Sequence, residues 1–461
     1  MFAGCGKKPK GRQVPKDWSV SAREGEIRML ERRKPDLLMP LKGYAKSRKS
    51  QKKHTKRQSP ALDALRAAVT LTKDAVHAVG VTAIDVVRDG AAFIGLSSPA
   101  EELQNPFSNL DAPIWEQHPP QEIINIAFDY CESLTRREAG NFYHSFKYLP
   151  DEQRRAMCAV YSFCRRADDI ADGDWKDVFQ GSLGPDDPEA IAYRSEFEQL
   201  SDRPAVIDED AYKTKLAQLF FFRKKLSTCY NGLTSTDPVF LALKDTVQTY
   251  QIPQEYFGDL ISGMEDDLFN NRYRTFDELY LYCYRVASVV GLMCIEIYGY
   301  DDEEARRFAE SWGIFMQLTN VLRDVGEDIG RNRVYLPLQE LEENKITVSE
   351  LDGTVLRNKQ WEAYTYHYAK RARTYLAEAQ KLIPLLPRRS RYSPAAMTAF
   401  YDAILKQIIK RQGDVFSSRI RLNKVQKIWL AAAVYVRYRF LPFFLAPVWD
   451  LFARVGLLPR V

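Results

Sequence analysis

The placing of proline constrains the fold of this chain more than any other sequence feature. No proline occurs between Pro253 and Pro337, and apolar residues in that interval recur with helical rather than alternating spacing. The other prolines of the body stand at the edges of periodic segments, where helices end. We therefore predict an all-α body over residues 121–423, built as a helical bundle.

Composition divides the rest of the chain. Residues 1–60 hold 18 Lys or Arg against 5 Asp or Glu, and the remainder holds 48 against 56, so we expect a basic, disordered arm. Residues 61–110 repeat apolar residues at three- and four-residue steps, which predicts an amphipathic helical segment and a linker. Residues 427–461 are aromatic-rich but interrupted by arginine and proline. That pattern suits either an interfacial membrane anchor or a last helix packed on the body.

Several classes of protein are excluded by what the sequence lacks. No stretch approaches the roughly 18 uninterrupted apolar residues that a membrane-spanning helix needs. The seven cysteines include no C-x-x-C pair, which argues against a disulfide scaffold or a zinc ribbon. No glycine-rich phosphate loop occurs, and there are only five histidines. Polar chemistry in this chain is therefore left to carboxylates, arginine and tyrosine.

Two acidic clusters are the candidates for such chemistry. Asp168 and Asp172 are four residues apart, as are Asp324 and Asp328, so each pair shares one helix face. Like charges at that spacing destabilise a helix unless a cation compensates for them. Mg²⁺ is the natural cation, because it binds through one or two carboxylates together with substrate phosphates.

The neighbours of the clusters strengthen this interpretation. Gln317, Asn320 and the two aspartates that follow them form one polar stripe at steps of three, four and four residues. Arg165 and Arg323 place a guanidinium beside each cluster, ready for phosphate oxygens. One acidic turn alone is usually a solvated surface feature. Two such turns, 156 residues apart and each next to a small-residue apolar stretch, predict faces that converge across a bundle to hold a diphosphate.

A third segment, residues 276–293, changes character along its length. Its second half is small and apolar with Gly291 embedded in it, which allows a hydrocarbon or another helix to approach the backbone closely. The tyrosines Tyr280 and Tyr284 share a face, a pattern that is more often core than active site.

Three ordered blocks resemble the squalene/phytoene synthase family, the head-to-head prenyl transferases, and most of all its phytoene synthases. The blocks are YCESLTRREAGNFYHSFKYLPDEQRRAMCAVYSFCRRADDIADG (130–173), GMEDDLFNNRYRTFDELYLYCYRVASVVGLM (263–293) and QLTNVLRDVGEDIGRNRVYLPLQEL (317–341). The resemblance covers about residues 121–423 and implies an isoprenoid synthase-type bundle around a central apolar cavity.

The resemblance also implies roles for single residues. The four aspartates match two Mg-binding motifs, and one arginine and one tyrosine match a diphosphate ligand and a group for proton transfer or cation stabilisation. These catalytic positions are Arg165, Asp168, Asp172, Tyr282, Asp324 and Asp328. The implied substrate-binding positions are Asn141, Phe142, Arg165, Val286, Gly291, Gln317, Asn320 and Arg323. Asn141 stands where the family more usually has serine or threonine.

The implied reaction is the condensation of two geranylgeranyl diphosphates, through a cyclopropyl diphosphate, to phytoene in carotenoid biosynthesis. It needs Mg²⁺, or Mn²⁺ in its place, and no NAD(P)H. The alternative in the same class joins two farnesyl diphosphates to presqualene diphosphate or squalene. The non-enzyme alternative is an inactive scaffold protein, which is expected to have lost acids from a cluster; all four are present here.

Partners and location follow from the chemistry of such substrates. Because substrates and product partition into lipid, we expect a cytoplasmic protein held peripherally at a membrane surface, within reach of downstream carotenoid enzymes. The location becomes a plastid if the N-terminal extension is a transit segment. The basic arm lacks interleaved aromatic residues and any recognisable module, so no nucleic-acid partner is expected.

Overall fold

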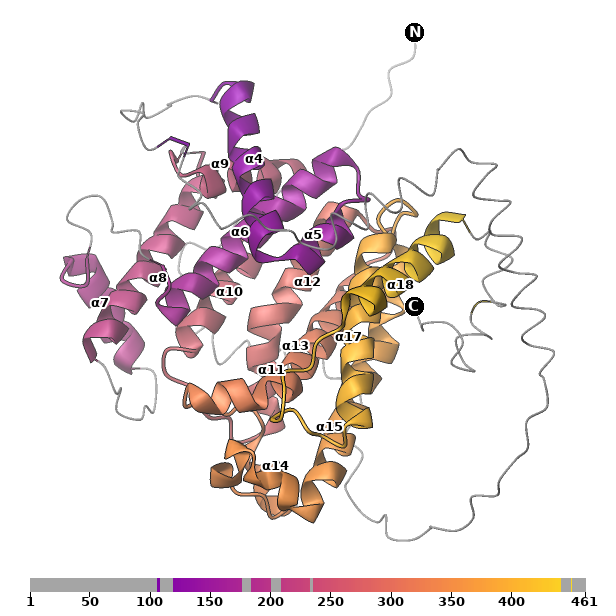
Figure 1. Cartoon of the computed structure of the whole chain (residues 1–461). Coiled ribbons are helices and arrows are strands. Elements are labelled where there is room, and N and C mark those ends of the chain that lie inside the picture. The colour runs from indigo at the N-terminus through magenta and orange to yellow at the C-terminus, as the bar shows by residue number, and fades with distance from the viewer. Residues whose placement is uncertain are drawn as a thin grey trace.

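The computed structural model describes residues 106–107, 119–175, 184–199, 209–232, 235–440 and 449. The basic arm, nearly all of residues 61–110 and nearly all of residues 441–461 lie outside these ranges. Within them every regular element is helical, apart from one isolated parallel bridge between Arg272 and Val334. The prediction of an all-α body is confirmed (Figure 1).

The helices end where proline, glycine or a loop interrupts the helical pattern. In chain order the first half comprises α4 (Gln121–Glu138), α5 (Gly140–Phe146), α6 (Asp151–Asp172), α7 (Pro188–Gln199), α8 (Glu209–Tyr230), α9 (Pro238–Tyr250) and α10 (Gln254–Asp266). The second half comprises α11 (Phe276–Cys283), the π-helix η1 (Tyr284–Ser288), α12 (Val289–Tyr298), α13 (Glu304–Gly330), α14 (Leu338–Glu343), the 3-10 helices η2 (Val348–Asp352) and η3 (Thr354–Arg357), α15 (Lys359–Ala379), α16 (Leu382–Leu385), α17 (Tyr392–Lys410), α18 (Lys424–Tyr435) and the π-helix η4 (Val436–Phe440).

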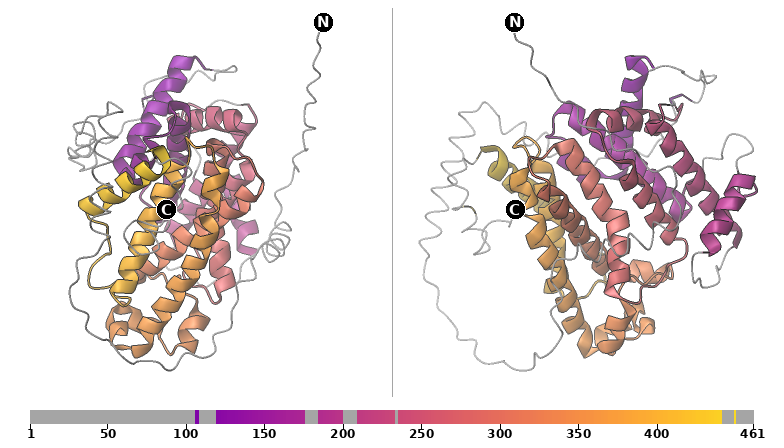
Figure 2. Two further views of the ribbon diagram at one scale, coloured as in Figure 1. Left: turned by 90° about the vertical axis from the view of Figure 1, so that its right-hand side faces the viewer. Right: turned by 180° about the vertical axis from the view of Figure 1, so that it is seen from behind.

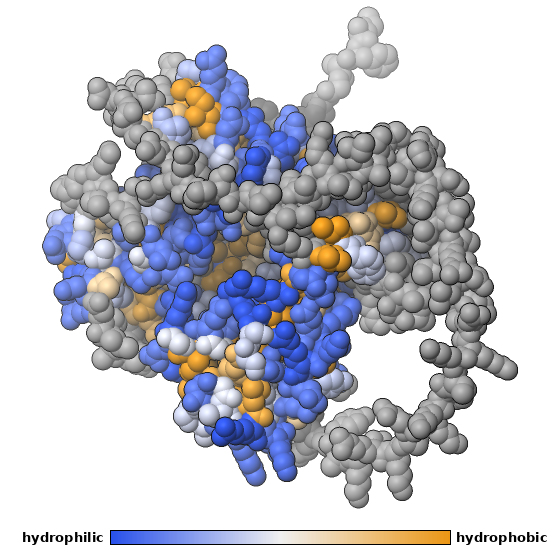
Figure 3. Space-filling view, viewed as in Figure 1, coloured by the Kyte–Doolittle hydropathy of each residue, from blue (hydrophilic) through white to orange (hydrophobic). Residues whose placement is uncertain are grey.

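Helix α13 is the long axis of the bundle. It packs along α15 on one side and against η1 and α12 on another, while α17 also contacts it. Helix α6 is packed by α4, α8, α9 and α10 in the other half of the molecule. Figure 2 shows the helices from the side and from behind. Figure 3 shows hydrophobic surface deep within a face whose rim is largely hydrophilic.

Glycine allows the α11–η1–α12 segment to lie almost against the backbone of α13. A Cβ placed on Gly313 would lie 2.4 Å from the Cα of Ser288, and one on Gly291 would lie 2.8 Å from the carbonyl oxygen of Ala309. The hydroxyl of Ser288 donates to the carbonyl of Glu310 at 2.9 Å. The small, apolar character noted for residues 276–293 therefore serves close packing of two helices.

The same segment has the length and hydropathy of a membrane span. Residues Phe276–Tyr298 form one continuous helical stretch of that kind, and 72% of its most apolar window is buried inside the bundle. Its hydrophobicity is thus accounted for by the core, where Tyr280 donates to the buried carboxylate of Glu310 at 2.6 Å. The expectation that the Tyr280 stripe belongs to the core is confirmed for this residue.

The close approach of α13 and η1 predicts a large penalty for a single methyl group. Gly313→Ala should lower the free energy of unfolding by about 1–3 kcal/mol, because backbone atoms of Ser288 cannot yield as a flexible side chain does. Gly330→Ala, at the end of the same helix, adds its methyl group to open space and serves as the control. Urea denaturation of both variants makes the comparison. Equal stability of the two variants would contradict the packing described.

Candidate active site

Helix α6 carries the first acidic cluster on the face that its arginine also occupies. Arg165 places Nη1 3.1 Å from Oδ2 of Asp168 and Nη2 2.5 Å from Oδ1 of Asp169. Asp168 and Asp172 stand one turn apart, and burial together with the charge of Asp172 raises the pKa of Asp168. The acids of this face are therefore crowded, and one guanidinium offsets only part of their charge.

The next residue, Arg166, points the other way and fixes the helix. Its guanidinium is buried, forms an ion pair with Asp237 and lies 4.5 Å over the ring of Trp175. Arg166 holds the pKa of Asp237 well below its usual range although burial acts against this. At the helix end, the ammonium of Lys215 donates to the carbonyl of Ala171 at 3.0 Å. Of these two adjacent arginines, Arg165 therefore contacts the acidic cluster, whereas Arg166 anchors α6 in the bundle.

Helix α13 presents the polar stripe expected from its sequence. Gln317, Asn320, Asp324 and Asp328 are all half-buried, and the amide of Asn320 donates to Gln317 at 3.2 Å. Arg323 binds Asp324 with two donors, one of them Nε at 2.8 Å. The stripe follows one face of a continuous helix, so its amide and acid groups line a single edge of the bundle.

The structure brings the two acidic helices together. Nη1 of Arg333 lies 3.2 Å from Oδ1 of Asp172, and Nη1 of Arg331 lies 3.5 Å from Oδ2 of the same carboxylate. Both arginines follow α13 directly, whereas Asp172 ends α6. Burial, Asp324 and Asp267 raise the pKa of Asp328 to about 7 even though Arg333 and Arg331 act in the opposite direction.

Asp267 belongs to this site although sequence reasoning missed it. Its carboxylate accepts hydrogen bonds from the hydroxyls of Tyr282 and Tyr335, each at 3.0 Å. Burial raises the pKa of Asp267 to about 7, against the lowering effect of Arg333. The ring of Tyr273 stacks on Tyr335 at 5.7 Å between centroids and lies tilted against Tyr282 at 5.2 Å, so three aromatic rings stand next to the carboxyl.

The two acids that precede Asp267 explain why it was missed. Glu265 is fully buried and pairs with Arg223 at 3.0 Å, and Asp266 pairs with Arg285 at 2.5 Å. These are structural ion pairs inside the bundle. The three acids are consecutive in the sequence and chemically similar. Only their tertiary partners distinguish Asp267 from Glu265 and Asp266.

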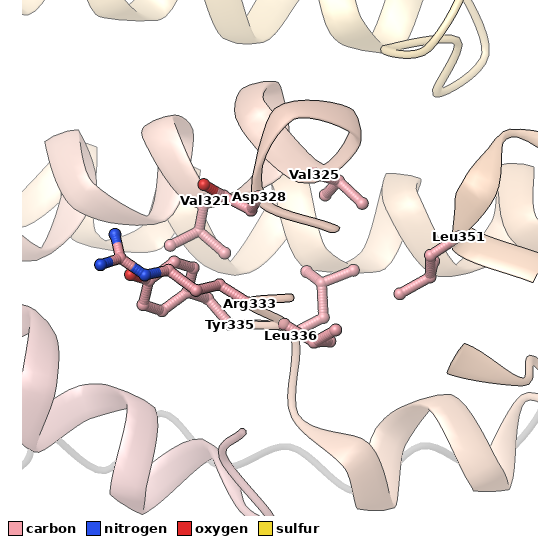
Figure 4. A pocket seen from close by; sticks show the side chains of 8 residues that line it. Val321, Val325, Asp328, Arg333, Tyr335, Leu336 and Leu351 are labelled. Atoms are coloured by element: carbon pink, nitrogen blue, oxygen red, sulfur yellow. The ribbon is translucent and has the colours of Figure 1, made fainter. Parts of the chain in front are cut away.

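Backbone hydrogen bonds hold the loops that carry these groups. The amide of Val334 donates to the carbonyl of Asn271 at 2.8 Å, and that of Leu338 donates to Tyr273 at 2.9 Å. The loop after α10 and the loop after α13 are thereby joined side by side. Figure 4 shows the resulting small pocket, in which Arg333 and Tyr335 lie beside the face of α13 that carries Val321 and Asp328.

A further arginine comes from the loop between α17 and α18. Nη1 of Arg419 lies 2.9 Å from Oε2 of Glu327, and Nη2 lies 3.4 Å from Oδ1 of Asp324. Asp324 therefore contacts two guanidinium groups, those of Arg323 and Arg419. This loop could not be assigned to the site from sequence, because nothing in its spacing indicates that it folds back onto α13.

The remaining expected substrate positions are placed as follows. Phe142 on α5 lies 5.9 Å, ring to ring, from Tyr161, one turn before Arg165 on α6. Val286 on η1 is half-buried and packs close to Gly263 of α10. Gly291 faces α13, as described above. The side chain of Asn141 lies outside the described residues. The substrate contacts of all four residues stay predictions.

The donor set suits a hard divalent cation. Carboxylates end both α6 and α13, and burial raises the pKa of Asp267 and of Asp328, the latter with help from the charges of Asp324 and Asp267. Within the described residues no three His, Cys, Asp or Glu side chains form a ready-made cage. Mg²⁺ does not require one, because it keeps water ligands and shares its remaining positions with phosphates.

The sequence matches a known family along most of this body. Residues 135–426 match the model of the family described as squalene/phytoene synthase. The chain is 34% identical over 321 residues to a chloroplastic phytoene synthase of an Oncidium hybrid cultivar, covering 68% of this chain and 69% of that protein. It is 33% identical to a 15-cis-phytoene synthase of Synechococcus elongatus, covering 66% of this chain and 91% of that protein.

Solved structures agree on the fold. A dehydrosqualene synthase in complex with a ligand is similar with a TM-score of 0.55 and 26% identity, covering 68% of this chain and 98% of that one. A squalene synthase from Alicyclobacillus acidocaldarius is similar with a TM-score of 0.52 and 25% identity, covering 64% of this chain and 97% of that one. These enzymes support the isoprenoid synthase-type bundle.

The pKa of Asp267 predicts a pH-dependent contribution to stability. Because the folded pKa of about 7 exceeds the ordinary value of 3.8, unfolding releases a proton in the window between them, and stability falls as pH rises through it. Asp267→Asn cannot ionise, so its stability relative to wild type should increase from pH 4 to pH 7. Denaturant titrations across this range measure the difference. Asp129→Asn, an exposed acid on α4, is the control and should follow the wild-type slope; the same slope for Asp267→Asn would refute the assignment.

Proposed function

The chain belongs to the squalene/phytoene synthase family, and on that premise we propose that it joins two geranylgeranyl diphosphates head to head to make phytoene. The single observation that carries the proposal is the meeting of the α6 and α13 acid faces across Arg331 and Arg333. A diphosphate is the ligand that such a mixture of carboxylates and guanidinium groups fits best, provided that a divalent cation joins it.

Each charged group then has a task in binding. We assign Asp168 and Asp172, with Asp324 and Asp328, to Mg²⁺, which when bound supplies charge neutralisation for the departing diphosphate. In the structure Asp168, Asp172 and Asp324 are paired with arginines from two helices and two loops, namely Arg165, Arg323, Arg331, Arg333 and Arg419. Once the acids have another cation, the guanidinium forks are released to bind diphosphate oxygens.

The reaction requires that positive charge be made and kept away from water. Loss of diphosphate from one substrate leaves an allylic cation, which the double bond of the second attacks; proton loss closes the cyclopropane. Loss of the second diphosphate, rearrangement and a second proton loss give the linear hydrocarbon. Two diphosphates and two protons leave, so no hydride donor is needed. The apolar bundle beside the acids is where such cations survive.

Tyr282 and Asp267 are the groups that we propose for the protons. Tyr282 is buried and its hydroxyl donates to Asp267, so a proton accepted near the tyrosine has a carboxylate next to it. Arg333 stands close enough to Asp267 to lower its pKa, which links the acid to the diphosphate side of the site. The tyrosine ring can also face a carbocation through its π-electrons.

The names of relatives support the twenty-carbon substrate. Proteins named phytoene synthase from a plant and a cyanobacterium match 68% and 66% of this chain, at 34% and 33% identity. The solved structures of similar fold are a dehydrosqualene and a squalene synthase, which keeps condensation of two farnesyl diphosphates as the second candidate. Plant relatives carry chloroplastic in their names, so we propose a plastid location, with the enzyme peripheral to the membrane.

The decisive assay supplies purified protein and Mg²⁺ with labelled geranylgeranyl or farnesyl diphosphate, without NADPH, followed by product extraction. We expect a C40 hydrocarbon from the first substrate. Presqualene diphosphate from the second substrate alone would move the protein to the squalene branch, and turnover of neither would favour the scaffold alternative.

The acid faces predict a selective loss of activity. Asp168→Asn and Asp324→Asn should each lower Mg²⁺-dependent turnover at least about a hundredfold, because charge stabilisation of the leaving group is lost. Glu304→Gln removes an exposed acid at the far end of the same helix, and it should stay within a few-fold of wild type. Circular dichroism checks the fold. Full activity in either aspartate variant would overturn the binding scheme.

The proposed role of the buried tyrosine predicts a change in product. Tyr282→Phe removes the hydroxyl next to Asp267, so the second proton loss should slow, and the rearranged cation should be captured by water or lose a different proton, giving alcohols or isomeric hydrocarbons beside phytoene. Tyr280→Phe, two residues away, removes a hydroxyl bound to Glu310 in the core and should lower stability while the product ratio stays unchanged. Chromatography of the products from both variants separates the two roles. An unchanged product ratio in Tyr282→Phe would contradict the assignment.

A further inference from the structure

Helix α18 carries an apolar face on its outer side. Leu430 and Val434 are buried against the body, whereas Val425 is 76% exposed and Trp429 is 50% exposed. Ala432 is exposed one turn further along. The spacing of four and three residues places Val425, Trp429 and Ala432 on one stripe, the α18 apolar face. The packing of α18 on the body does not account for the α18 apolar face, because these side chains remain exposed.

The face is held in a fixed position beside α5. The ring of Tyr435, at the end of α18, lies 4.9 Å from Tyr148 and 5.9 Å from Tyr392, and α18 runs across the outside of α17. Tyr148 follows α5 and is itself 42% exposed. Figure 1 shows α18 on the surface next to α5, the helix that carries Phe142. The face is therefore part of a rigid surface close to an expected substrate position.

The segment that carries the α18 apolar face is basic. Between Asp414 and Asp450 the sequence contains no acid. Arg419 is engaged by Asp324 and Glu327, and the other basic residues are Arg421, Lys424, Lys427, Arg437 and Arg439. Burial and the nearby charge of Arg421 lower the pKa of Lys427, which shows that these cations crowd one another. On α5, the charges of Lys147 and Lys427 help to lower the pKa of His144. A partner for this surface must therefore bring negative charge.

We propose that the α18 apolar face, with Tyr148, docks on the surface of an anionic lipid bilayer. A half-exposed tryptophan next to aliphatic residues and cations is the combination that helices lying in a membrane interface use. A second copy of this chain would bring the same cations against each other, so charge complementarity disfavours it. The choice of lipid as partner rests in part on the proposed function, because prenyl diphosphates and a C40 product reside in membranes.

The test is flotation of the full-length protein with vesicles, without substrate. One set contains equal parts of phosphatidylcholine and phosphatidylglycerol, and the other contains phosphatidylcholine alone. Val425→Ser combined with Trp429→Ser should lower partitioning into the anionic vesicles about tenfold, because apolar surface no longer enters the lipid. Tyr366→Ser is the matched control, since that aromatic side chain is 54% exposed on α15; it should bind like wild type.

Two further measurements separate this surface from other sources of binding. Residues 1–60 also attract anionic lipid, but that attraction is screened at high salt, where the apolar contribution and its loss in the double variant should persist. Arg421→Gln should weaken binding to the anionic set alone, whereas Arg357→Gln, an exposed arginine on η3, should not.

The outcomes decide the proposal without relying on catalysis. Turnover of detergent-solubilised substrate should be unchanged in the double variant, so loss of turnover in every form of the protein would count against the proposed function and not against docking. The proposal would be overturned if both the double variant and Val425→Ser alone bound anionic vesicles as strongly as wild type does. It would also be overturned if the double variant altered only self-association in sedimentation experiments.

Discussion

The apposition of carboxylates at the ends of two long helices is the constraint on which the rest of this structure depends. Asp172 ends α6 and Asp328 lies in the last turns of α13, and such like charges repel unless cations stand between them. Arg331 and Arg333 supply that charge to Asp172. Burial and the charge of Asp324 nevertheless raise the pKa of Asp328, although both arginines act in the opposite direction.

Much of the bundle can be understood as a means of holding these helices in place. The buried pair of Arg166 with Asp237 fixes α6 from behind, and Lys215 binds its last turn. The backbone contact between Gly313 and Ser288 fixes α13 against η1. None of these groups needs to touch a substrate. Their energetic role is to hold α6 and α13 in place against the repulsion between the acid faces.

Neighbouring residues of the same type have separate tasks because a helix turns each one toward a different partner. Arg165 faces the acids while Arg166 is buried. Glu265 and Asp266 are bound by arginines of the core, whereas two tyrosine hydroxyls hold the carboxyl of Asp267. A single acidic or basic motif therefore predicts little by itself, because neighbouring residues of one type can have entirely different tertiary partners.

Sequence alone determined the helical nature of the body, the two acid pairs and the polar stripe on α13, because these follow from spacing along one helix. It could not identify Arg333, Tyr335 or Arg419, which reach the site from loops, nor distinguish Asp267 from the acids before it. It also left open whether the small residues near Gly291 meet a hydrocarbon or another helix, and the structure places α13 there. Local periodicity is set by the geometry of one helix. Which faces meet across the bundle is decided only by packing, because that depends on residues far apart in the chain.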